Sequence, residues 1–133
     1  MHETLCALFL STAMLAASQS SSSSEWVGIW QGELDGQPSV TLTVAQDNAT
    51  LEGTLVLNII TRDGGKPHIV AHEPHTLMHP QVDGVTLSFQ LRRIDGTSDP
   101  MRFHVEMTSH EKAKIHCLNC GDNAPVVEIT KLD

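Results

Sequence analysis

Apolar and polar residues alternate with a period of two along three stretches of this chain. Successive side chains of a β-strand point to opposite faces, so each stretch has one face for a core and one for water. No comparable 3.6-residue pattern exists after residue 20, and the sequence therefore predicts an all-β domain. The alternating apolar positions are Val40, Leu42 and Val44, then Val85, Leu87, Phe89 and Leu91, and finally Met101, Phe103, Val105 and Met107.

Turn signals, most often Asp-Gly, divide the remaining chain into weaker strands. These strands cover residues 26–34, 51–60, 67–72, 112–118 and 126–132. The total is about eight short strands with short links, the number at which an antiparallel meander closes and removes its edges. We therefore expect an eight-stranded up-and-down barrel, with a two-sheet β-sandwich as the alternative.

The first predicted strand alternates glycines with large apolar residues. Gly28 and Gly32 share one face with Trp26, Trp30 and Leu34. Glycine inside a strand marks a sharp bend or a place where a neighbouring residue packs directly on the backbone. Both features are expected at the corner of a barrel.

Residues 1–20 have the features of a cleavable signal peptide with a helical apolar segment. The apolar run from Leu5 to Ala17 is too short to span a bilayer but fits the central region of a leader. Ala16 and Ser18 stand at the spacing for cleavage, although no Lys or Arg precedes the run. The alternative is a buried amphipathic helix, but no polar stripe divides the run at helical spacing.

The leader hypothesis divides the chain into three parts. Residues 1–20 form the signal peptide, residues 21–25 a disordered serine-rich tether, and residues 26–133 a single β-barrel domain. The protein is then secreted or periplasmic. The part after the leader keeps 15 of the 16 acidic residues and all 8 basic ones. Because an acidic surface repels phosphate, we expect neither nucleic-acid nor membrane-surface binding, and no membrane span after cleavage.

The step Gly28-Ile29-Trp30, at the start of the first predicted strand, resembles the G-x-W signature of lipocalin-like proteins. That pattern also places an Arg of the last strand over the Trp, a position for which this chain offers Lys131. Stretches 28–44, 72–91 and 117–131 are similar to a group of exported bacterial domains to which no activity is assigned. The resemblance implies a small lipocalin-like barrel with a bacterial envelope or extracellular address, and it implies no chemistry.

Four histidines, His68, His72, His75 and His79, fall within one twelve-residue stretch. Their spacing suits a metal site on a helix, but the prolines among them disfavour a helix. In an extended segment, histidines four residues apart are separated by about 13 Å, too far for one ion. We expect a polar surface segment of irregular backbone from His68 to Pro80, with a kinked edge strand around Pro74.

A second histidine pair depends on the register of two predicted strands. Pairing Glu106 with Lys114 about a turn at residue 110 places His104 opposite His116. Opposed Cβ atoms lie about 5 Å apart, close enough for two imidazoles to share Zn or Cu. The alternative is two solvated surface histidines.

Cys117 and Cys120 form a Cys-x-x-Cys motif in a chain that we expect to fold outside the cytosol, where a disulfide is the default. A redox pair needs the first Cys at a helix N-terminus, a zinc ribbon needs a second Cys pair, and haem attachment needs a His after the second Cys. None of these features is present.

Three hypotheses for function follow, none of them enzymatic, because no catalytic motif is present and no cofactor is implied. The first is an exported binding module that holds a small apolar ligand inside the barrel. The second is a surface that binds a protein partner through His68 to Pro80, because long links are often functional. The third is metal binding by surface histidines. The residues predicted to line the ligand cavity are Trp26, Trp30, Leu42, Leu55, Leu87, Phe89, Phe103 and Val105.

Overall fold

The computed structural model describes residues 23–97 and 99–133, so the predicted signal peptide, residues 1–20, lies outside the described residues. Nine antiparallel strands form one sheet, which confirms the all-β prediction. The strands are β1 (Gly28–Leu34), β2 (Gln37–Asp47), β3 (Thr50–Thr61), β4 (His68–Thr76), β5 (Met78–Asp83), β6 (Thr86–Leu91), β7 (Met101–Ser109), β8 (Lys112–Cys117) and β9 (Val126–Leu132). Two 3-10 helices, η1 (Ser23–Trp26) and η2 (Asp63–Gly65), complete the described elements.

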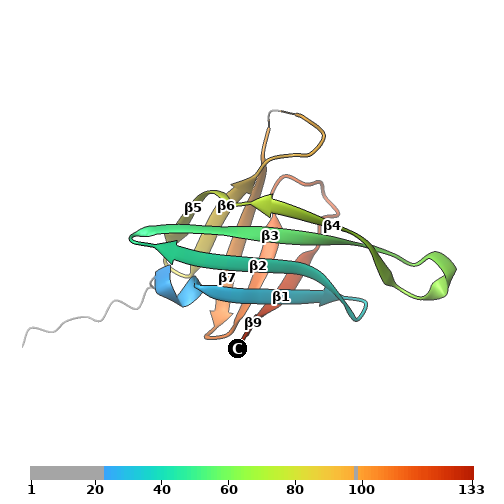
Figure 1. Ribbon diagram of the computed structural model, residues 1–133, viewed down its shortest axis with the longest axis horizontal. Coiled ribbons are helices and arrows are strands. Elements are labelled where there is room, and N and C mark those ends of the chain that lie inside the picture. The colour runs from blue at the N-terminus through green and yellow to red at the C-terminus, as the bar shows by residue number, and fades with distance from the viewer. Residues whose placement is uncertain (1–22, 98) are drawn as a thin grey trace, which may run out of the picture.

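The sheet curls into a half-barrel with β1–β4 crossing in front of β6–β9 (Figure 1). The strand order is β4-β3-β2-β1-β9-β8-β7-β6-β5, so the first strand pairs with the last. That pairing brings Ile29 opposite Leu132 and joins the two ends of the meander. The edges of the sheet are therefore β4 and β5, which follow one another in the chain but do not pair.

The segment from His68 to Pro80, which we expected to be irregular, forms β4 and β5, and that expectation is wrong. β4 pairs with β3, and β5 pairs with β6. The Leu77 backbone N–H donates to the Gly53 carbonyl oxygen at 3.0 Å, after which the chain leaves β3 and joins β6. All neighbouring strands in the sheet are antiparallel, so directions alternate across the sheet. β4 and β5, at its two ends, therefore run in the same direction. They amount to one strand bent at Leu77, the fourth of an eight-stranded meander.

The edge position predicted for the strand around Pro74 is confirmed, because β4 is an edge of the sheet, but the pairing runs without a register shift from Ala71 to Thr76 and the bend lies at Leu77 instead. Pro74 lies opposite Val56, three positions before the bonded pair of Leu77 and Gly53. Bonded and non-bonded pairs alternate in an antiparallel ladder, so the Pro74 nitrogen faces the free edge. A proline there removes a donor that an incoming strand would need, which protects the edge against pairing with another chain.

One hydrophobic core fills the space between the front and rear strands. All eight residues predicted to line a ligand cavity belong to this core, each at most 7% exposed. Phe89 and Phe103 stack with ring centroids 5.4 Å apart, and Trp26 and Trp30 are 5.3 Å apart. The inward positions of the alternating stretches therefore pack against one another.

Trp30 lies where the first and last strands of the sheet meet. Its indole N–H donates to the Trp26 carbonyl oxygen at 3.0 Å. The Lys131 ammonium lies 5.6 Å from the ring centroid and donates to the Glu25 carbonyl oxygen at 3.0 Å. Lys131 also packs on the Gly28 backbone, where an added Cβ would lie 2.8 Å from its Cε. The glycine therefore makes room for the lysine stem, as the strand pattern predicted.

The start of the domain differs from the sequence expectation. Of the predicted tether 21–25, residues 23–25 form the first part of η1. Trp26 ends this helix and is fully buried, so the core fixes the position of η1. The ordered domain therefore begins before Trp26.

Gly53 tests how tightly β3 packs on β2 beside the bend in the fourth strand. A Cβ added there would collide with the Thr43 carbonyl oxygen of the neighbouring strand. We expect Gly53→Ala to lower the free energy of unfolding by about 1–3 kcal/mol, as overpacking does, measured by urea denaturation. The control Glu52→Ala, at an exposed neighbouring position, should change stability by at most about 0.5 kcal/mol. Equal stability of the two variants would contradict the tight packing of β2 on β3 at this point.

Candidate functional site

A pocket of about 240 Å³ opens between the front and rear strands at one end of the half-barrel. We call it the mouth pocket. Its front wall comes from the end of β1, the start of β2 and the end of β3, and its rear wall from β7, β8 and β9. The residues that line it are Leu34, Ser39, Val40, Leu57, Asn58, Phe103, Ile115, Cys117, Cys120, Ala124, Pro125 and Val127.

The lining is almost wholly apolar, and its polar groups have partners inside the protein. The Ser39 hydroxyl donates to the Gly32 carbonyl oxygen at 3.4 Å. The Asn58 amide donates to the Pro38 carbonyl oxygen at 2.8 Å, and its side-chain oxygen lies 2.6 Å from His72 Nδ1. These groups are therefore engaged in holding the walls, and the pocket favours an apolar occupant.

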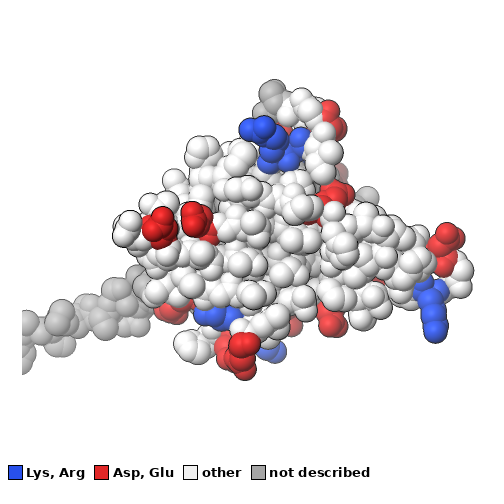
Figure 2. Space-filling view, viewed as in Figure 1, with Lys and Arg blue, Asp and Glu red and all other residues white. Residues whose placement is uncertain are grey.

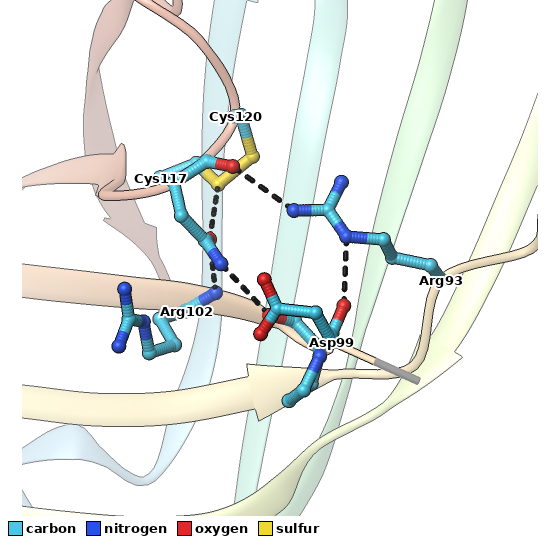
Figure 3. The surroundings of a disulfide bond; sticks show 7 residues. Arg93, Asp99, Arg102, Cys117 and Cys120 are labelled. Carbon is cyan, nitrogen blue, oxygen red and sulfur yellow. Dashed lines mark hydrogen bonds between the residues drawn. A yellow bond between two sulfur atoms is a disulfide. The ribbon is translucent and has the colours of Figure 1, made fainter. Parts of the chain in front are cut away.

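The loop after β8 closes one side of the mouth pocket and contains the predicted disulfide. Cys117 and Cys120 are bonded, with Cα atoms 5.6 Å apart (Figure 3). Cys117 ends β8 and is buried, whereas Cys120 is exposed on the loop. The bond therefore holds the loop against the strand end that lines the pocket.

Asn119 and Arg93 join this loop to the neighbouring loop between β6 and β7 (Figure 3). The Asn119 side chain donates to the Pro100 carbonyl oxygen at 2.9 Å and accepts the Arg102 backbone N–H at 2.8 Å. Arg93 donates to the carbonyl oxygens of Asp99, at 2.8 Å, and Asn119, at 2.9 Å. The wall of the pocket is thus tied at several points.

Only Phe103 of the eight predicted ligand residues borders the mouth pocket. The other seven belong to the core, and none of them lines the mouth pocket. Sequence reasoning assigned the largest alternating side chains to a cavity, but these side chains are the ones that fill the half-barrel. It missed Leu34, Ala124 and Pro125, although the Cys-x-x-Cys motif marked the loop beside them.

The mouth pocket continues into an exposed apolar rim. Leu34 and Ile59 are each 41% exposed, and Ile59 shares the inward face of β3 with Leu57. The hairpin of β3 and β4 projects past the rest of the half-barrel at this end (Figure 1). An apolar molecule in the pocket therefore has further apolar surface beside it.

The predicted register of β7 and β8 is confirmed, with Glu106 opposite Lys114 and His104 opposite His116. Within residues 23–97 and 99–133, however, no group of three or more potential ligand residues is close enough to hold a metal ion. The two histidines thus stand as an isolated pair, and metal binding by them stays a prediction.

The four histidines from His68 to His79 do not converge. His72 contacts Asn58, whereas His75 is buried on the opposite face of β4. His68 Nδ1 lies 3.1 Å from the Lys66 carbonyl oxygen, and His79 lies beyond the bend with a φ of 51°. The expectation that these four residues do not form one metal site agrees with their placement.

The loop between β6 and β7 contains the one clear perturbation of acidity among the described groups. The Thr97 backbone N–H and hydroxyl donate to Asp95 Oδ1 at 3.0 and 2.9 Å. Thr97 thereby lowers the pKa of the fully exposed Asp95 carboxyl, first through its backbone and then through its side chain, with a smaller contribution from Arg93. The Asp95 carboxylate thus accepts hydrogen bonds within its own turn.

No family model, curated protein or solved structure matches this chain. Among the described residues no helix has the length and apolar character to cross a membrane.

Asn119 tests how firmly the pocket wall is held. Asn119→Ala removes the bond to Pro100 and leaves the Arg102 N–H without its acceptor, so we expect a loss of about 1–2 kcal/mol in the free energy of unfolding. Hydrogen exchange in residues 118–125 should rise in parallel. The control Asn123→Ala, at an exposed position of the same loop, should change neither measurement. An unaltered exchange rate in Asn119→Ala would show that the disulfide and the backbone bonds to Arg93 and Arg102 hold the loop without the Asn119 side chain.

Proposed function

We propose that the protein is a non-enzymatic binding module that holds a small apolar ligand in the mouth pocket. The single observation that carries the proposal is the pocket itself, a largely apolar recess with a disulfide-tethered wall. Its volume of about 240 Å³ lies below the roughly 300–1,000 Å³ of drug-sized ligand sites. The ligand is therefore small, or it leaves part of its body on the rim at Leu34 and Ile59.

The proposed relation to lipocalin-like domains supports the same function. The G-x-W step at Gly28, the helix before it and Lys131 over Trp30 form one connected arrangement at the closed side of the half-barrel. This arrangement leaves the ligand to the opposite, open end. The relation remains a proposal, and it includes an exported, secreted or periplasmic address that depends on residues 1–20.

Filling the pocket tests the proposal with benzene as the probe. Titration of the domain with benzene should shift the methyl NMR signals of Leu57, Ile115 and Val127, which line the pocket. Ala124→Phe places a ring at the half-buried wall and should weaken binding at least about tenfold, a change of about 1.4 kcal/mol. The control Ala45→Phe adds the same ring at an exposed position of β2 and should leave affinity unchanged.

Two outcomes would contradict the proposal. One is an absence of shifts in the pocket methyl groups at saturating benzene. The other is equal affinity of Ala124→Phe and the unaltered domain, which would place the probe elsewhere. Mass spectrometry of protein isolated under native conditions from its own host then identifies the natural ligand.

Protein binding through His68 to Pro80 is a second candidate, favoured by two observations. This segment forms both edges of the sheet, and Val70 on β4 is 55% exposed. A partner strand would pair with β4 over the residues before Pro74, because the proline lacks a donor on the free edge.

A further inference from the structure

A second pocket, of about 610 Å³, lies where β4 diverges from the end of β6. We call it the wedge. One side consists of the bent strand around Leu77, and the other of the residues that follow β6. No residue borders both the wedge and the mouth pocket. The residues that line the wedge are Pro74, His75, Thr76, Met78, Arg92, Arg93 and Ile94.

His75 is the buried polar group of the wedge. The residue is 9% exposed and faces inward opposite Leu55. Its Nε2 atom is buried without a hydrogen-bond partner among the described residues. The closest carboxylate oxygen, Glu73 Oε1, lies 3.9 Å away, beyond hydrogen-bond distance, and Glu73 does not border the wedge. Leaving such an atom unsatisfied costs about 1–3 kcal/mol, so a small rotation of the ring that brings Nε2 onto a ligand in the wedge gains an advantage.

Two arginines supply positive charge to the same pocket. Arg93 is fixed by the carbonyl oxygens of Asp99 and Asn119, which carry no net charge, and the Asp95 carboxylate interacts with it electrostatically. Arg92 is exposed, and within the described part of the chain neither arginine forms an ion pair. The nearby Asp95 carboxylate is engaged by Thr97.

The position of this charge is unusual for the molecule as a whole. The chain has a net charge of −8, yet basic side chains gather at the loop after β6 (Figure 2). Arg92 and Arg93 also border a third pocket of about 440 Å³ with Gly96, Thr97 and Pro100. Guanidinium groups recognise carboxylates through paired N–H donors. Arg92 and Arg93 border both pockets, whereas the acidic Asp95 and Asp99 of the same loop border neither, so both pockets favour an anion.

We propose that the wedge binds a small organic anion, a carboxylate carried on an apolar body. Arg92 and Arg93 bind the carboxylate together with His75, while Met78, Pro74 and Ile94 supply apolar contacts. The apolar lining distinguishes such a ligand from a bare inorganic anion. The site shares no lining residue with the mouth pocket and does not depend on the function proposed for it.

Sodium benzoate is the probe that tests the wedge. Titration should shift the His75 ring signals and the Arg92 and Arg93 side-chain Nε signals in NMR spectra. Arg92→Gln, at an exposed position that should not affect folding, is expected to weaken benzoate binding at least about tenfold. His75→Gln should weaken it as well. Arg102→Gln removes an exposed arginine that does not border the wedge and should change affinity less than about twofold.

Neutral and inorganic probes make the result decisive. Benzyl alcohol has the same ring without the charge and should bind at least about tenfold more weakly than benzoate. Inorganic phosphate should also bind more weakly, and equal affinity for phosphate would overturn the choice of an organic ligand. Equal benzoate binding by Arg92→Gln and Arg102→Gln would overturn the site. Benzoate titration of Ala124→Phe keeps this test separate from the mouth pocket, because that variant should bind benzoate normally.

Discussion

The bend of the fourth strand at Leu77 is the constraint on which the shape of the half-barrel depends. Before the bend the strand is paired with β3, and after it with β6, so one strand serves both halves of the sheet. The Leu77 N–H donates to Gly53, which keeps the corner attached to β3. β4 runs beside β3 and β5 runs beside β6, so a gap lies between β4 and the residues after β6. The wedge lies in that gap, so the pocket is a consequence of how the sheet changes direction.

A second constraint closes the opposite side. β1 pairs with β9 in register, and Lys131 adds a cation over Trp30 and a bond to the Glu25 carbonyl oxygen. A cation over an indole ring contributes about 0.5–2 kcal/mol, depending on how much water it loses. This side of the half-barrel is therefore sealed by backbone pairing and by side chains from both ends of the chain. The mouth pocket lies at the free strand ends, and the wedge lies between β4 and the residues after β6.

The sequence was sufficient to predict most of the strands and the register of β7 with β8, apart from the irregularity between Met107 and Ser109. Alternation predicts strands because the inward residue at each second position is buried. The opposite charges of Glu106 and Lys114 indicated how β7 pairs with β8. β5 was missed because His79 and Pro80 interrupt its pattern, and its residues are regular only through pairing with β6. The mouth pocket was missed for a different reason. A pocket exists where side chains fail to meet, and that depends on how the strand ends separate, which alternation does not encode.

Arg93 connects the two pockets physically. It borders the wedge, and its guanidinium donates to the Asn119 carbonyl oxygen. Asn119 lies between the two disulfide cysteines, which line the mouth pocket. A charged side chain held by two carbonyl oxygens loses little further conformational freedom when an anion binds, so the wedge has one cation in place before the ligand arrives. The bond to Asn119 attaches the loop between β6 and β7 to the pocket wall after β8, and the bond to Asp99 holds that loop to itself. One side chain thus serves to rigidify the apolar pocket and to supply charge to the polar one.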